Sequence, residues 1–355
     1  MHGLAALLLL LAAPATAQAP AAVASRECTI CHGRPEFKVV RSDGSIVPLF
    51  IDEQQLKASV HARWQCLDCH ADAIRIPHPA PLARVNCQRC HFTGNSAGAP
   101  QDVDYDAYGR SVHGRLRLAG NTKAPTCRDC HGGHDVRSHT DASSRVSRAD
   151  LPRTCGRCHV EVFSHFERSV HGQALLVKGN LEAPNCASCH GEHNIMRARE
   201  RGSGVSASQI PDTCSNCHGS MAFNTRFDIP INPVKTFEHS FHGIANSLGS
   251  LKVAECSSCH TAHDVLPPED PASSVNPANI PATCGKAGCH EGANANYARG
   301  HFHIDPESKD SGVIYWVTLF FKILTASTMV GLIAHILLDL VKKLRTRHEG
   351  GHAGA

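Results

Sequence analysis

The sequence predicts a mainly α-helical and irregular fold, in which sparse short helices alternate with long loops and one transmembrane helix lies near the C-terminus. Three observations lead to this prediction. The 355 residues include 18 cysteines and 26 histidines, whereas aromatic residues make up only 5%. The cysteines recur in paired motifs, and residues 313–338 form an apolar run with a single charge. Domains of this length normally fill their core with Leu, Ile, Val and Phe, so another group is expected to fill this one.

Residues 1–17 have the pattern of a secretory signal peptide. The apolar run Leu4–Ala13 is too short to span a bilayer, and residues 15–17 form a small-residue cleavage site. The same shortness argues against the alternative, an uncleaved N-terminal anchor. The rest of the chain is therefore expected to be exported from the cytoplasm.

The cysteines all belong to one pattern, C-x-x-C-H, which is the attachment signature of c-type haem. Two thiols bond to the porphyrin, and the adjacent histidine binds the iron on the proximal side. Eight copies occur, and a ninth has four residues between its cysteines; together they use all 18 cysteines. The predicted haem-bonding residues are Cys28, Cys31, Cys66, Cys69, Cys87, Cys90, Cys127, Cys130, Cys155, Cys158, Cys186, Cys189, Cys214, Cys217, Cys256, Cys259, Cys284 and Cys289. The predicted proximal iron ligands are His32, His70, His91, His131, His159, His190, His218, His260 and His290.

Zinc sites, redox dithiols and disulfides are the alternative uses of such cysteines. None of them explains why a histidine follows the second cysteine of every pair. Between Gln18 and Gly312 about 33 residues remain for each motif, which is too few to give each haem its own domain. Nine haems are therefore expected to pack closely and to supply the hydrophobic core. The formal charge of +3, without a basic stripe interleaved with aromatics, gives no support to nucleic-acid binding.

From the second motif onward the motifs come in pairs, each with a leading and a trailing member. In the last three pairs the first cysteines are 28 residues apart, and a Ser-x-His-Gly segment precedes each leading motif. The first pair has a step of 21 residues. The predicted organisation is a signal peptide (1–17), a single-haem segment (18–58), four dihaem units (59–110, 111–168, 169–239 and 240–312), a transmembrane helix (313–341) and a basic cytoplasmic tail (342–355).

A second histidine is expected on the distal face of each iron, because imidazole is a standard haem ligand. The repeats offer the Ser-x-His segments and the last histidine of Cys-His-x-x-His. In the first pair Ala73 takes the place of that histidine, and His78 is the nearest substitute. The distal candidates are His61, His78, His113, His134, His171, His193, His242, His263, and either His301 or His303. Spacing does not tell which histidine serves which iron.

Other side chains fit less well as iron ligands. His139, His165 and His239 do not recur and are expected not to bind iron. Met196 and Met221 do not recur either, so low-spin, bis-histidine, low-potential haems are predicted.

The apolar run 313–338 is long enough to span a bilayer. Tyr315 and Trp316 suit its outer interface, and the basic residues of 342–347 suit the cytoplasmic side. A buried core helix is the alternative. Lys322 and His335 are expected to reach the interface or to contact a partner subunit.

These motifs resemble those of the membrane-anchored multihaem cytochromes c of respiring bacteria, in the c3-like and doubled C-x-x-C-H families, over residues 28–303. The longer ninth motif resembles the variant of tetrahaem c3 cytochromes, and residues 329–339 look like the anchor of relatives that pair with a b-type cytochrome. The resemblance implies a nonahaem protein of the bacterial inner membrane with its haem domain in the periplasm. It implies electron transfer from the quinol pool or a b-type cytochrome to periplasmic or extracellular acceptors and redox partner proteins in anaerobic respiration.

The alternative function is a multihaem reductase of nitrite, hydroxylamine, tetrathionate or sulfite, which would need one open iron. The site of His32 is the candidate, because no Ser-x-His segment precedes it. Neither a C-x-x-C-K motif nor a very long Cys–Cys gap, which mark many such enzymes, occurs here. An electron carrier is therefore favoured over an enzyme.

Overall fold

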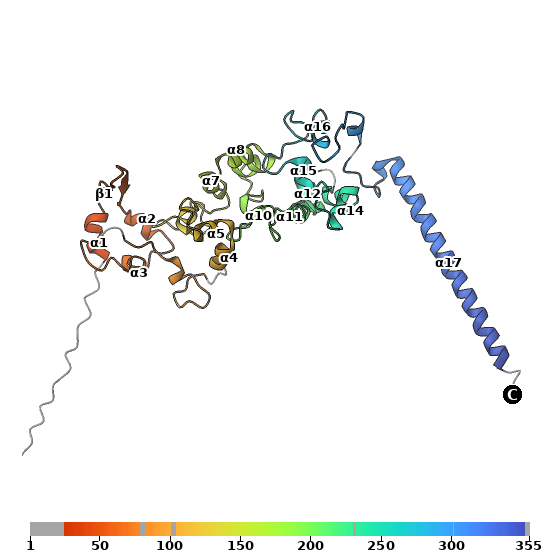
Figure 1. Ribbon diagram of the computed structural model, residues 1–355, viewed down its shortest axis with the longest axis horizontal. Coiled ribbons are helices and arrows are strands. Elements are labelled where there is room, and N and C mark those ends of the chain that lie inside the picture. Colours follow the sequence, from red (N-terminus) through yellow and green to blue (C-terminus); the bar gives the residue numbers. More distant parts are fainter. Residues whose placement is uncertain (1–24, 79–81, 101–103, 230–231, 301, 352–355) are drawn as a thin grey trace, which may run out of the picture. The chain divides into compact units, whose positions relative to one another are not determined.

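The computed structural model describes residues 25–78, 82–100, 104–229, 232–300 and 302–351. The signal-peptide prediction lies outside these residues. Backbone contacts divide the chain into two units, Met1–Thr154 and Cys155–Ala355. In each unit short helices are joined by irregular loops (Figure 1), which confirms the predicted secondary structure.

The first unit is mainly irregular and contains short helices and one small hairpin. Its elements are α1 (Ser25–His32), β1 (Lys38–Val40), β2 (Ile46–Pro48), α2 (Glu53–Lys57), α3 (Cys66–Cys69), η1 (Cys87–Arg89), α4 (Asp104–Arg110), α5 (Val112–Leu118), α6 (Cys127–His131) and most of α7 (Leu151–Gly156).

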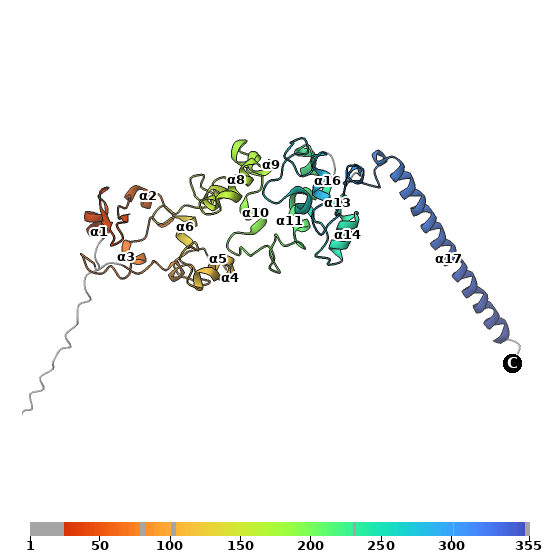
Figure 2. The ribbon, with the colours of Figure 1, turned by 45° about the horizontal axis from the view of Figure 1, so that its top comes forward.

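The second unit has more helix and ends in one long helix. Its elements are α8 (Val160–Arg168), α9 (Val170–Gly172), η2 (Gln173–Val177), α10 (Cys186–His190), α11 (Ile210–His218), α12 (Met221–Arg226), α13 (Pro233–Glu238), α14 (Phe241–Ser247), α15 (Cys256–His260), α16 (Ile280–Cys284), η3 (Tyr297–Arg299), η4 (Lys309–Ser311) and α17 (Val313–Gly351). Figure 2 shows α13 and α14 side by side, and these two helices are in contact.

Each leading motif lies on a short helix that begins at its first cysteine. The residue before the second cysteine folds back and accepts a hydrogen bond from the backbone N–H of the N-cap residue. Asp129 accepts from Thr126 at 2.7 Å on α6, and Ser258 accepts from Glu255 at 3.2 Å on α15. This capping box satisfies N–H groups that the first turn leaves unpaired. A polar residue before the second cysteine therefore starts the helix that carries the motif.

The trailing motifs are positioned by a bond that recurs in three repeats. A threonine just before the first cysteine donates its hydroxyl to a carbonyl nine residues upstream. The bonds are Thr154 to Arg145 (2.7 Å), Thr213 to Gly204 (2.6 Å) and Thr283 to Ser274 (2.7 Å). The sequence repeat is therefore also a structural repeat.

The β1–β2 hairpin was not predicted, although the sequence carries its signal. Val39 pairs with Val47 in an antiparallel register, and the turn between them contains Asp43 and Gly44. Gly44 has φ of +79°, a conformation that glycine adopts without strain. An Asp-Gly pair between two apolar runs is a strong hairpin signal. The hairpin leads into Leu49, which contacts the first motif.

Few apolar side chains are buried in the described residues. The buried ones are Ala73, Ala107, Ala124, Leu175 and Ala183, four of which carry only a methyl group. Large side chains such as Phe241 and Leu248 are about four-fifths exposed, at 79% and 83%. The polypeptide alone therefore forms no apolar core of ordinary size in these residues.

Helix α17 is long enough and apolar enough to cross a membrane, by length and composition, over Val313–Arg345. Its side chains are exposed along this length. The helix continues to Gly351, so the boundary predicted at residue 341 is not a helix end, and residues 342–351 of the predicted tail are helical.

Candidate functional site

Seven of the nine predicted proximal histidines face a second histidine at nearly the same distance. The ring centroids lie 5.9–6.2 Å apart in every pair. The pairs are His32 with His78, His61 with His91, His70 with His134, His171 with His218, His190 with His263, His242 with His290, and His260 with His303.

This separation lies in the upper part of the range for packed aromatic rings, and it also suits an ion between the two imidazoles. A metal–imidazole bond is about 2.0 Å long, as in zinc sites, so one ion held between opposed rings places their centroids about 6 Å apart. The seven pairs have this spacing although they lie in loops and helices of different sequence. Bare-ion clusters are a different arrangement, and the described residues contain no group of three or more His, Cys, Asp or Glu side chains that could hold a metal ion.

The partner of each proximal histidine follows a rule. A trailing motif faces the Ser-x-His histidine of its own repeat, as His218 faces His171. A leading motif faces a histidine that follows the next leading motif, as His190 faces His263. His32, the proximal histidine of the single-haem segment, faces His78 in the same way. In these seven pairs a repeat thus supplies one histidine to itself or one to the repeat before it.

Two of these histidines have their Nδ1 atom fixed by a hydrogen bond. His32 Nδ1 donates to the carbonyl oxygen of Leu49 at 2.7 Å, just after the hairpin. His303 Nδ1 lies 2.8 Å from the hydroxyl of Thr236, which itself donates to the carbonyl of Asn232 at 3.0 Å. Because the hydroxyl proton is used elsewhere, His303 is assigned as the donor. Both rings are therefore left with Nε2 as the free, basic nitrogen.

Burial lowers the pKa of ten of the paired imidazoles. Burial lowers the pKa of His171 to about 4, and the neighbouring His218 lowers it further. Burial is also the main cause of a lowered pKa at His61, His70, His134, His190, His218, His242, His260, His263 and His303. A neutral imidazole is the form that binds metal, so the lowered pKa favours ligation by these ten imidazoles.

The serine and the glycine of the Ser-x-His-Gly segments each have a structural role. Ser169 caps α9: its hydroxyl accepts from the backbone N–H of Gly172 at 3.0 Å and donates to the carbonyl of Phe166 at 2.6 Å. A Cβ at Gly172 would overlap that carbonyl oxygen. Gly114 and Gly243 meet the same limit in the neighbouring repeats. The serine and glycine therefore set the helix turn that presents the histidine between them.

The first repeat departs from this segment and has a different local geometry. Ala62 stands where the other repeats have glycine. Here the hydroxyl of Ser59 accepts from the N–H of His61 at 3.1 Å, two residues away, and donates to the carbonyl of Leu56 at 2.7 Å. His61 still faces its trailing partner, His91.

Equivalent backbone bonds join successive repeats. The N–H of Val60 donates to the carbonyl of Val136 at 2.9 Å in the first unit, and Val170 donates to Val265 at 2.9 Å in the second. Both donors precede a Ser-x-His histidine, and both acceptors lie two residues after a Cys-His-x-x-His histidine. These bonds place the two kinds of distal candidate next to each other.

His165, expected to be no iron ligand, has a different role at the same junction. Its Nδ1 lies 3.2 Å from Oδ2 of Asp264, and Arg168 is 3.6 Å from the same oxygen. Asp264 is the residue after His263. His165 therefore supports the loop that carries His263.

The cysteine sulfurs of consecutive motifs lie close together. A trailing motif contacts the next leading motif through its first cysteine, because the thiols of Cys87 and Cys127 are hydrogen-bonded. The same contact joins Cys28 to Cys66, Cys155 to Cys186, and Cys214 to Cys256. If haem were attached, these atoms would be thioether sulfurs without an S–H donor. The hydrogen bonds would then be absent, but the sulfurs would still lie close together.

Within a repeat the two motifs meet through the second cysteine of the leading one. Burial raises the pKa of Cys189, and the nearby thiols of Cys214 and Cys217 raise it further. Cys69 with Cys90, and Cys259 with Cys284, show the same relationship. In each unit, motifs that are neighbours in the sequence are therefore neighbours in space.

The remaining predicted ligands lie outside these seven pairs. His113 lies on α5 just after its capping residue Ser111, and His193 lies in the loop after α10. His301 falls outside the described residues, so of the last two candidates the structure places His303. No sequence motif indicated that Thr236 would contact His303 or that the carbonyl of Leu49 would contact His32.

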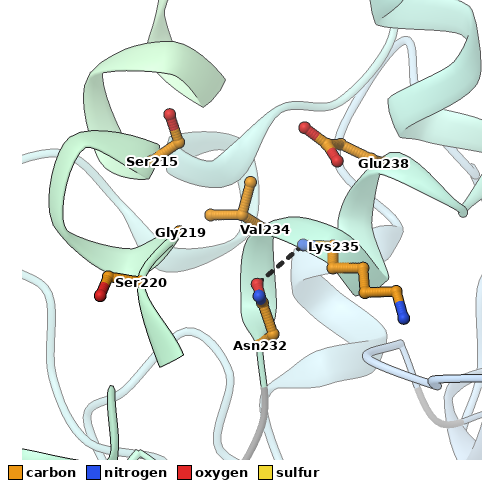
Figure 3. A pocket seen from close by; sticks show the side chains of 7 residues that line it. All are labelled: Ser215, Gly219, Ser220, Asn232, Val234, Lys235 and Glu238. Carbon is orange, nitrogen blue, oxygen red and sulfur yellow. Dashed lines mark hydrogen bonds between the residues drawn. The ribbon is translucent and has the colours of Figure 1, made fainter. Parts of the chain in front are cut away.

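An open pocket of about 440 Å³ lies beside the seventh motif, between α11 and α13 (Figure 3). Ser215 and Ser220 line one side, and Asn232 accepts a hydrogen bond from the N–H of Lys235 at 3.0 Å on the other. The side chain of Lys235 points away from the two serines.

No family model, no curated protein and no solved structure matches this chain.

Proposed function

We propose that this chain is a membrane-anchored, nonahaem c-type cytochrome that transfers electrons. The observation that carries the proposal is the recurrence of seven histidine pairs, each containing the histidine of a C-x-x-C-H motif and each spaced for one iron. A Cys2His2 zinc site would gather two thiolates and two imidazoles on one ion, and the described residues contain no group of three or more such side chains that could hold a metal ion. A disulfide gives neither histidine a role. The scarcity of buried apolar side chains supports the same proposal, because close-packed macrocycles would fill that space.

The residues present fit haem at each motif. The two cysteines would hold the porphyrin covalently, and the two facing imidazoles would close both axial positions of the iron. When bound, haem supplies one-electron chemistry through the ferric and ferrous states of its iron. The chain's own contribution is to fix the imidazoles, favour the neutral form of ten of them and hold consecutive motifs close enough for electron transfer.

The other two motifs also have repeated histidines as candidate distal ligands. His131 and His159 are their proximal histidines, and His113 and His193 are the repeated histidines that the seven pairs do not use. We therefore propose bis-histidine coordination at all nine irons. This coordination favours low potentials, because no methionine takes an axial position.

The alternative function, a reductase with one open iron, is disfavoured at the first motif, which was its best candidate site. The first motif was proposed for that role because no Ser-x-His segment precedes it. The ring centroids of His78 and His32, however, lie 6.1 Å apart, and the two ring planes are 10° from parallel. We infer that His78 closes this iron and that the protein is an electron carrier.

The sequence of α17 supports an anchor in the bacterial inner membrane. Its apolar residues suit a bilayer span, and the basic residues Lys342, Lys343 and Arg345 follow on the side expected to be cytoplasmic. With an exported N-terminal part, the haem domain would lie in the periplasm. The donor would then be the quinol pool or a b-type cytochrome, and periplasmic or extracellular acceptors would receive the electrons.

The proposal is tested by expressing the full chain in a host that matures c-type cytochromes. Intact-mass spectrometry should show nine covalently attached haems, and a pyridine haemochrome assay should give the same number. Electron paramagnetic resonance of the oxidised protein should show low-spin signals from all nine. Fewer adducts, bound zinc or cystine would contradict the haem assignment, and one stoichiometric high-spin iron would favour the reductase.

A further inference from the structure

Lys322 is the only charged residue of the apolar run 313–338, and the structure pairs it with a residue outside the helix. Its Nζ lies 2.7 Å from Oε1 of Glu307, which precedes α17 in the chain. The second oxygen of Glu307 accepts from Nζ of Lys235 at 2.9 Å. Asp305 lies 3.5 Å from the same Lys235 nitrogen. These four side chains form one ion-pair network between α17 and α13.

The network continues toward a histidine pair through α13. Lys235 is followed on this helix by Thr236, which is buried and binds Nδ1 of His303 at 2.8 Å. His303 faces His260 with ring centroids 6.1 Å apart. Polar contacts made by the adjacent residues Lys235 and Thr236 of α13 thus link α17 to the eighth motif.

The position of Lys322 also locates the membrane. The apolar run 313–338 of α17 would be about 39 Å long, whereas the hydrocarbon core of a bilayer is about 30 Å thick. Part of the helix must therefore lie outside the hydrocarbon. A lysine bound to Glu307, itself bound to α13, is held at the level of the soluble domain.

The segment after Lys322 has the length of one span. Ile323–Val341 would extend about 28 Å, and Lys342 follows directly. Trp316, two turns before Lys322, would then lie among the lipid head groups, where this residue type is enriched. Asp339, near the other end, is paired with Lys343 at 2.7 Å within the helix.

We propose that the Lys235–Glu307–Lys322 network fixes α17 against the His260–His303 site and makes this site the one presented to the membrane for electron entry. The inference rests on the proposed function. It adds that the bilayer begins just after Lys322 and that electrons enter at the eighth motif. The ninth motif, which contacts the eighth through Cys259 and Cys284, would then lie beside the entry point.

The test uses a spin label on the full chain in phosphatidylcholine–phosphatidylglycerol nanodiscs. Because the haems occupy all 18 cysteines, Val317→Cys would provide a single free thiol. Val317 is exposed and lies in the first turns of α17, before Lys322. The distance from label to the nearest iron should be narrowly distributed. Glu307→Gln should broaden this distribution, whereas Lys343→Met, which breaks an ion pair within α17, should leave it unchanged. An unchanged distribution in Glu307→Gln would overturn the role of the network.

A second pair of variants identifies the iron nearest the label. His303→Met should change the relaxation of the label, because it alters the iron of the eighth motif, while His242→Met at the ninth should not. Thr236→Val provides a milder change at the same site if His303→Met fails to fold. The reverse outcome would overturn the entry site. A wild-type protein with fewer than nine haems would instead contradict the proposed function, so the two failures are distinguishable.

Discussion

The imidazole rings of His190 and His263 lie 5.9 Å apart in planes 8° from parallel, although they belong to different repeats. Neither residue lies on an extended regular element, and little apolar packing surrounds them. Their alignment is explained if both bind one iron, because two short bonds fix separation and direction together. The predictions below test this explanation and its consequences.

Ring orientation predicts different electron paramagnetic resonance signals for different sites. His32–His78 and His190–His263 are nearly parallel, at 10° and 8°, whereas His61–His91 are 79° apart. Parallel imidazoles give rhombic low-spin ferric signals, and perpendicular ones give a strongly axial signal with a large maximum g value. The oxidised protein should show both types, and His61→Met should remove only an axial signal. A spectrum of rhombic signals alone would contradict the geometry at His91.

Replacing a distal histidine should affect the iron of another repeat. His263→Ala removes the ring opposite His190, so one of nine irons should become high-spin, and that iron should be the one attached at Cys186 and Cys189. The readout is quantitative electron paramagnetic resonance combined with carbon monoxide binding to the reduced protein. His165→Ala, which removes the contacts to Asp264 and Arg168 and no predicted iron ligand, is the matched control and should leave all irons low-spin.

Gly172→Ala should destabilise the third repeat. The added methyl would overlap the carbonyl of Phe166, to which Ser169 donates, and such overpacking costs about 1–3 kcal/mol. The midpoint of guanidinium unfolding, followed by the Soret band, should fall. Gly109→Ala meets no atom within 4 Å and serves as the control. Equal midpoints for the two variants would show that the close approach at Gly172 is not limiting.

Thr236→Val should raise the reduction potential of the eighth site. The variant removes the hydroxyl that accepts from His303 Nδ1 and leaves the backbone of Pro233 as the partner of this ring. The imidazole should then be a weaker donor to ferric iron. A tenfold decrease in the ratio of the imidazole's affinities for ferric and ferrous iron raises the reduction potential by about 59 mV for one electron. Spectroelectrochemistry should show one of nine haems shifted upward by up to this amount. Thr225→Val on α12 should leave the titration unchanged.

The ion-pair network at α17 should be lost only in acid. The hydrogen bond from Lys322, together with that from Lys235, lowers the pKa of Glu307 from 4.5 to about 2. A carboxyl with a lowered folded-state pKa stabilises the fold fully above its unfolded value, and the effect is lost as the pH falls through the folded one. The label distances at Val317→Cys should therefore stay narrow from pH 7 to pH 5 and broaden between about pH 4.5 and pH 2. In Glu307→Gln the distances should not depend on pH in this range.

Much of this arrangement could be predicted from sequence because the chemistry uses fixed spacings. The C-x-x-C-H motifs identified the proximal member of all seven pairs, the Ser-x-His segments identified His61, His171 and His242, and the Cys-His-x-x-His motifs identified His134 and His263. His78 was only the nearest substitute, and His303 was one of two alternatives. Spacing could not say that His263 faces His190 and not His260, because that choice depends on the path of the chain between repeats. Backbone bonds such as Val170 to Val265 set this path, and they leave no mark on side-chain identity.

Other features were missed for different reasons. The β1–β2 hairpin carried an Asp43-Gly44 turn signal that the expectation of irregular loops concealed. Thr236 and Glu307 have no recurring motif, since each acts once, at the junction with α17. The extension of α17 to Gly351 was missed because basic residues mark the end of a span but continue a helix readily.

The rule that each leading motif borrows a histidine from the following repeat has a consequence for how such chains change length. A duplicated repeat inserted between two others would receive a closing imidazole from its new neighbour and lend one to its predecessor, with no other adjustment. Two repeats depart from the rule: His78 replaces the histidine that Ala73 displaces in the first repeat, and His303 closes the last repeat just before the anchor. The architecture can thus grow or shrink by whole units during evolution while the terminal segment stays the same.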